Sequence, residues 1–173
     1  MFTKIDLCSM ALLKLGEKPI QSWHEDTVAA QLSRTLFDST VDTLIAMFPW
    51  RFATQKIVLI RNTDGDFVIP SNVLRILKSE GQIIGNKIDT SGDTIEILAI
   101  VKTEPEHFPN YFASLLATKL ALEFCIPLIG DSNVFRMLSA LYESEYQSAK
   151  FIDSTTSTNQ SNIDKFSLIN SRF

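Results

Sequence analysis

The densest group of side chains suited to acid–base chemistry is the run His24-Glu25-Asp26. A histidine beside carboxylates can act as a general base or bind a metal ion. Three consecutive residues point in different directions, however, and acidic side chains are favoured where the first N–H groups of a helix lack partners. The pattern therefore favours helix capping over catalysis. The other histidine, His107, is predicted to lie on the surface in the first turn of a later helix.

No motif for nucleotide or metal chemistry occurs in the sequence. The patterns GxxxxGK[ST], GxGxxG, HExxH and GxSxG are all missing, and the glycines are scattered across turns. Cys8 and Cys125 lie far apart in apolar stretches, without the CxxC spacing of a metal site. We expect two buried free thiols in preference to a disulfide, and we predict no catalytic residue, no metal ligand and no cofactor.

The net charge and the composition of the apolar stretches argue against duplex DNA as a primary ligand and against a membrane span. The formal net charge is −4, whereas proteins that neutralise duplex phosphates gather Lys and Arg on one face. Double-stranded DNA is therefore not expected as a primary ligand. The longest apolar stretch, 111–129, contains Lys119, Glu123 and Pro127, which favours a buried helix over a bilayer span. We expect a soluble protein with no signal peptide and no membrane partner.

Apolar residues recur every three or four positions in four stretches, which predicts four helices. Thr3 and Asp6 form a capping-box pattern at the start of the first. Asp26 is the predicted N-cap of the second helix, which Pro49 ends, and Thr103 is the predicted N-cap of the third. The helices are expected at about 3–15, 26–48, 105–127 and 131–151.

The fourth predicted helix has an apolar face and a charged face. The apolar face, expected to be buried, contains Val134, Met137, Leu138, Leu141 and Tyr142. The opposite face carries Glu143, Glu145 and Lys150.

Between the second and third helices, the pattern changes to short β-branched runs. They are separated by Asp64-Gly65, Gly85-Asn86 and Ser91-Gly92, which supply the positive φ angles of tight turns. An antiparallel β insert of roughly four to six strands is therefore expected at about 54–102. The predicted fold class is α+β: mainly a bundle of four helices, with an antiparallel β insert and an extended C-terminal arm.

Residues 1–152 are expected to form one domain, and 153–173 a flexible linker and arm. The run 154–162 is entirely polar and cannot offset the entropy of its own ordering. An apolar peptide beyond a polar linker is a candidate for docking on a partner, although it can also fold back on its own core. The apolar arm residues are Ile163, Phe166, Leu168, Ile169 and Phe173.

The run Phe48-Pro49-Trp50-Arg51-Phe52 holds three aromatic rings in five residues. Such anchors concentrate binding energy in protein interfaces, so Trp50, Arg51 and Phe52 are candidate interface residues, together with Trp23. The alternative, which we favour for this run, is that these aromatic side chains are buried in the core where the second helix meets the β insert.

Four segments resemble those of one protein family, and their order and spacing carry the resemblance over residues 3–150. The segments are ALLKLGEKPI at 11–20, FPWRFA at 48–53, LATKLA at 116–121 after Pro105, Phe108 and Tyr111, and LIGD at 128–131, before a Tyr-rich helix. The family that they resemble is the head-to-tail adaptors of short-tailed phages and related prophage proteins, also called tail tubular protein A.

The resemblance implies a structural virion protein of the head–tail junction, assembled in the host cytoplasm. In this family a helical bundle stands beside a β-rich region, and copies form a dodecameric ring under the portal. The ring extends the DNA channel used in genome packaging and DNA ejection. The implied partners are the portal ring, the tail nozzle or another tail protein, further copies, and double-stranded DNA passing through the lumen without sequence recognition. An acidic lumen would repel phosphate and avoid trapping DNA.

Two alternatives belong to other functional classes. The first is a non-enzymatic binding protein that captures a single partner with the Trp50 region and the C-terminal arm; it predicts a 1:1 complex and no ring. The second is an enzyme with a site built from His24, Glu25, Asp26 and Arg51, which no motif supports.

Overall fold

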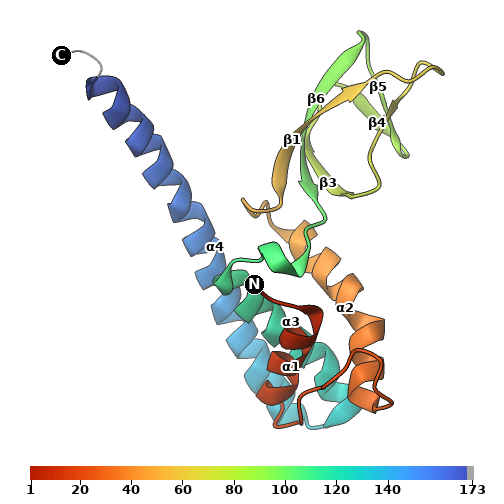
Figure 1. Cartoon of the computed structure of the whole chain (residues 1–173), viewed down its shortest axis with the longest axis vertical. Coiled ribbons are helices and arrows are strands. Elements are labelled where there is room, and N and C mark those ends of the chain that lie inside the picture. Colours follow the sequence, from red (N-terminus) through yellow and green to blue (C-terminus); the bar gives the residue numbers. More distant parts are fainter. Residues whose placement is uncertain (171–173) are drawn as a thin grey trace. The chain divides into compact units, whose positions relative to one another are not determined.

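The computed structural model of the protein describes the backbone of residues 1–170 and the side chains of residues 1–155. The fold is mixed α+β, as predicted, and the chain divides into two compact units (Figure 1). Residues 38–108, with Met1, form the β unit. Residues 2–37 and the chain from 109 onward form the helical unit. The chain passes from one unit to the other within helix α2 (Val28–Met47) and again after Phe108.

The helical unit contains α1 (Lys4–Lys14), α3 (Asn110–Leu128) and α4 (Ser132–Asn170), and α3 packs against both α1 and α4 (Figure 1). The predicted capping box of α1 is confirmed: the Asp6 N–H donates to Thr3 Oγ1 at 3.1 Å, and the Thr3 N–H donates to Asp6 Oδ2 at 2.9 Å. The two thiols are free and buried, as predicted.

Helix α3 is the core of the helical unit. Apolar side chains lie on every side of it, and most of the helix, including Phe112, Leu116 and Phe124, is buried. Among the described residues, this helix alone is long and apolar enough to span a bilayer, but 61% of that window is buried inside the structure. Burial within a protein core accounts for a helix this rich in apolar residues.

Helix α3 begins later than predicted. Pro105–His107 form a separate 3-10 turn, and Thr103 does not cap α3. The reason is Pro109, because a proline disfavours helical geometry at the preceding residue, and Phe108 is accordingly extended at φ −72°, ψ 127°.

Helix α4 runs to Asn170, beyond the predicted helix end at about 151. No Gly or Pro occurs between Ser132 and Asn170, and Ser, Thr or Asn in a helix costs only about 0.7 kcal/mol or less relative to Ala. The hydroxyls of Ser154 and Thr155 donate to the carbonyls of Lys150 at 2.8 Å and Ile152 at 3.0 Å. The side chains predicted to dock, Ile163, Phe166, Leu168, Ile169 and Phe173, lie outside the described side chains.

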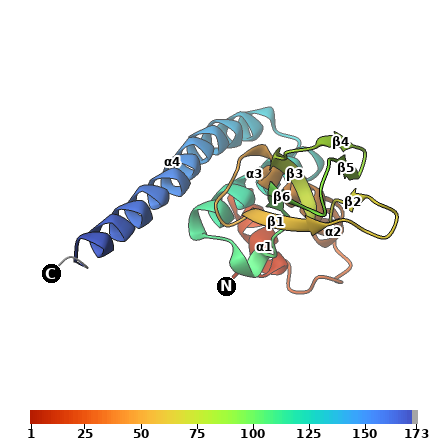
Figure 2. The same ribbon diagram turned by 90° about the horizontal axis from the view of Figure 1, so that it is seen from above.

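The β unit confirms the predicted antiparallel insert, and its strands form two three-stranded sheets within the described chain (Figure 2). The first sheet has the order β1-β6-β3, and the second has the order β2-β5-β4. Gly65 and Gly85 adopt positive φ angles of 86° and 61° in the expected turns. The strands are β1 (Thr54–Ile60), β2 (Phe67–Val68), β3 (Val73–Lys78), β4 (Gln82–Ile84), β5 (Lys87–Asp89) and β6 (Thr94–Val101).

Alternating side chains of β6 build the core of the β unit. Ile95 and Ile97 are buried, whereas Thr94 and Glu96 are exposed, as expected for a strand with one face inward. Further core residues come from β1, β2 and β5, and partly buried side chains complete the cluster. The cluster consists of Leu59, Phe67, Ile88, Ile95, Ile97 and Ala99, with Ile57, Ile69, Val73 and Ile76 packed against it.

Candidate protein interface

Trp50 belongs to the core of the β unit. Its side chain is 0% exposed, and its Nε1–H donates to the Leu44 carbonyl at 3.0 Å. The ring lies 4.9 Å from the ring of Phe48 and 6.4 Å from that of Phe52, measured between centroids. The structure thus agrees with the favoured core interpretation and corrects the assignment of Trp50 to an interface.

The other predicted interface residues do not form one group within either unit. Arg51 is exposed in the β unit, where Phe52 is half-buried with its ring 5.8 Å from that of Phe108. Trp23 belongs to the helical unit, half-buried at 6.0 Å from the ring of Phe37.

Within the His24-Glu25-Asp26 run, Glu25 stabilises the loop before α2 by hydrogen bonds. The Glu25 carboxylate accepts the Gln21 N–H at 2.7 Å, the Ser22 N–H at 3.2 Å and the Thr27 hydroxyl at 2.8 Å. The bond from the Gln21 N–H is the main reason that the pKa of Glu25 is lowered. Thr27 caps α2 in place of Asp26, because its hydroxyl oxygen accepts the Ala30 N–H at 3.2 Å.

The described residues contain no group of three or more His, Cys, Asp or Glu side chains placed to hold a metal ion. His24 is exposed. The fourth residue of the enzyme alternative, Arg51, belongs to the β unit, whereas the His24-Glu25-Asp26 run belongs to the helical unit.

Replacing Glu25 by glutamine is expected to reduce the acid sensitivity of the protein. The folded-state pKa of Glu25 is lowered, so its contribution to stability is present above the unfolded value of about 4.3 and is lost as the pH falls through the folded value. Urea unfolding at several values from pH 7 to pH 3 should show a shallower decline for Glu25→Gln than for the wild type. Identical profiles for Glu25→Gln and the wild type would contradict the assignment.

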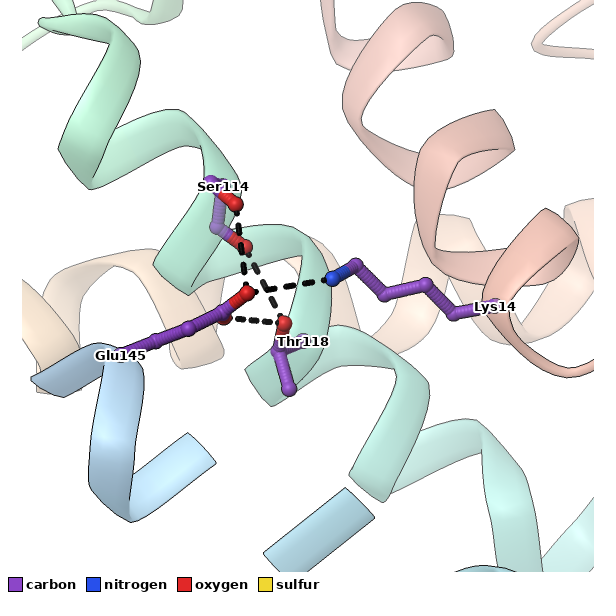
Figure 3. Close-up of polar contacts among 4 residues, drawn as sticks. All are labelled: Lys14, Ser114, Thr118 and Glu145. Atoms are coloured by element: carbon purple, nitrogen blue, oxygen red, sulfur yellow. Dashed lines mark hydrogen bonds and ion pairs between the residues drawn. The ribbon is translucent and has the colours of Figure 1, made fainter. Parts of the chain in front are cut away.

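A polar network joins three helices inside the helical unit (Figure 3). Lys14 Nζ of α1 lies 3.3 Å from Glu145 Oε1 of α4, and both side chains are about one quarter exposed, at 26% and 23%. From α3, Ser114 Oγ donates to Glu145 Oε1 at 3.4 Å, and Thr118 Oγ1 donates to Glu145 Oε2. The carboxylate is satisfied from two helices, so the network fixes the position of α4 along α1 and α3.

A second polar contact holds α4 two turns further along. The Tyr111 hydroxyl donates to Asp153 Oδ1 at 2.6 Å, and Asp153 is only 2% exposed. Leu138, Glu145, Ala149 and Asp153 follow at intervals of seven, four and four residues, the spacing of one helix face. The prediction that Glu145 lies on the solvent face is therefore wrong.

The row of α4 beside these contacts carries exposed apolar side chains. Met137 is 74% exposed, Leu141 40% and Phe151 70%, so the predicted burial of the first two is wrong. Exposed Ser144 and Ser148 continue the same row at spacings of three and four. We call Met137, Leu141, Ser144, Ser148 and Phe151 the α4 stripe. A row of large exposed apolar side chains is typical of an interaction surface, and small residues in it allow close approach.

Comparison with protein-family models gave no match, and comparison with curated proteins found no relative.

Proposed function

We propose that this protein is a structural adaptor of the phage virion, which forms a dodecameric ring under the portal, extends the DNA channel and docks the tail. The proposal rests on the resemblance of residues 3–150 to the head-to-tail adaptors, and the helical bundle with an antiparallel β insert agrees with it. The partners are the portal ring, a tail protein, further copies and double-stranded DNA in the lumen, all at the head–tail junction.

The observation that carries the proposal is the α4 stripe. A subunit of a closed ring needs a surface that repeats around the symmetry axis, and it needs no reacting groups. The polar network at Glu145 holds the neighbouring row of α4 to its own unit, and Met137 and Phe151 remain exposed and available to another chain.

The energetics favour a ring that forms on the portal. Burying Met137 and Phe151 stabilises a contact by roughly 1.5–3 kcal/mol each. Association costs roughly 4–15 kcal/mol in lost freedom of motion, so the stripe alone supports only weak contact between copies. Neighbours already bound to a portal ring have lost most of that freedom, and the same contact then closes the ring.

Mass measurement by light scattering tests this function. The chain alone is expected to be mainly monomeric, and mixing it with its cognate portal ring should give one portal with about a dozen adaptors. The double variant Met137→Asp with Phe151→Asp should lose this complex while keeping the wild-type melting temperature, because both side chains are exposed.

Gln147→Asp is the charge control: it adds one negative charge, against two in the double variant, at an exposed position of α4 outside the stripe. Normal assembly of the double variant would exclude the stripe as the contact. A 1:1 complex with one partner, and no portal complex at any salt concentration, would instead favour the single-partner binding protein.

A further inference from the structure

Two strand edges of the β unit border one cavity. β3 is an edge strand of the first sheet and β4 is an edge strand of the second. A cavity of about 400 Å³ is lined by residues of both strands, including Val73 to Ile76 and Ile83. We call it the β3 groove; it lies entirely within the β unit.

The β3 groove follows the edge of β3. Four consecutive residues, Val73 to Ile76, line it. β3 pairs with β6 on one side only, and register shifts interrupt this pairing between Val73 and Arg75 and between Ile76 and Lys78. The backbone N–H and C=O groups of β3 on the side away from β6 are not part of the sheet ladder, and an edge of this kind can pair with another strand.

The lining is mainly aliphatic, with the polar residues Ser71 and Asn86 and one charged residue. Ile69, Val73 and Ile76 pack against the core on one side and line the groove on the other, and Ile83 is 48% exposed. Arg75 is the one charged residue of the lining, and among the described side chains no carboxylate forms an ion pair with it.

We propose that the β3 groove binds an extended segment of a partner protein, which pairs with the β3 edge. The segment has aliphatic side chains at alternate positions, to cover the apolar lining, and one carboxylate, to meet Arg75. Four residues of strand span about 13 Å, so a core of four or five partner residues fills the site. This inference is independent of the adaptor function.

NMR titration of the full ¹⁵N-labelled chain tests the proposal. The probe is a capped seven-residue peptide of alternating valine and threonine with a central glutamate. Its addition should shift the amide signals of Val73–Ile76 and Gln82–Ile84. A peptide N-methylated at alternate residues, so that one edge cannot pair, should bind roughly tenfold more weakly.

Charge exchange tests the role of Arg75. A peptide with lysine in place of glutamate should bind the wild type about 2- to 5-fold more weakly, and Arg75→Glu should reverse this preference. Ile83→Asp should weaken binding, whereas Ile60→Asp, on exposed β1, should leave it unchanged.

Three results would overturn the proposal: shifts confined to β1, equal binding of the N-methylated peptide, or no change of preference in Arg75→Glu. Equal binding of the N-methylated peptide would mean that the groove takes apolar groups without strand pairing.

Discussion

Replacing Trp50 by alanine is expected to lower the free energy of unfolding of the β unit by about 3–5 kcal/mol. The indole is 0% exposed and contacts the aromatic rings of Phe48 and Phe52, whose centroids lie 4.9 Å and 6.4 Å away. Its removal leaves a cavity and also leaves the Leu44 carbonyl without the Nε1–H donor. Urea unfolding followed by far-UV circular dichroism measures the change.

Two further variants show how much of this loss comes from side-chain volume, from the hydrogen bond and from the position of the tryptophan. Trp50→Phe keeps much of the volume and loses the hydrogen bond, so it should fall between the wild type and Trp50→Ala. Trp23→Ala removes the half-buried indole of the helical unit and should cost less. Wild-type stability of Trp50→Ala combined with loss of partner binding would restore the interface interpretation of Trp50.

Replacing Glu145 by alanine is expected to destabilise the helical unit by about 1–3 kcal/mol. The change leaves Lys14 without its carboxylate and deprives Ser114 and Thr118 of an acceptor. The cost stays below that of breaking a fully buried pair, because Lys14 and Glu145 are 26% and 23% exposed. Thr118 also keeps an alternative acceptor, the Ser114 carbonyl at 3.2 Å.

A double-mutant cycle with Lys14→Ala measures the coupling across the network, which we expect to exceed about 0.5 kcal/mol. Glu143→Ala is the matched control, since Glu143 is exposed on the same helix and accepts a hydrogen bond from the Gln147 side chain one turn away. Equal effects of Glu143→Ala and Glu145→Ala would show that the network does not hold α4.

Local signals predicted the parts of the fold that depend on neighbouring residues. The capping box at Thr3 set the start of α1, and Gly65 and Gly85 marked two turns of the β unit. The end of α4 was not predictable in this way, because the polar run 154–162 contains neither Gly nor Pro and composition alone suggested disorder. Pro109 was a local signal for the late start of α3 that the prediction missed.

The candidate interface was harder to predict because its orientation depends on distant residues. Helix α4 has two rows of suitable spacing, and the buried row is held by partners far away in the sequence, such as Lys14, which pairs with Glu145 131 positions away. The row 137, 141, 144, 148 and 151 was visible in the sequence but was assigned in part to the core. For Trp50, an aromatic side chain suits a core and an interface equally, so only its burial separates the two.

The two buried thiols give the helical unit a built-in reporter of its opening. Cys8 and Cys125 both belong to that unit, and residues 38–108 contain no cysteine. Burial raises the pKa of the Cys125 thiol, so little reactive thiolate is present at neutral pH. A thiol reagent therefore modifies these residues only through transient opening, and the rate of modification measures how often the helices separate, without any introduced label.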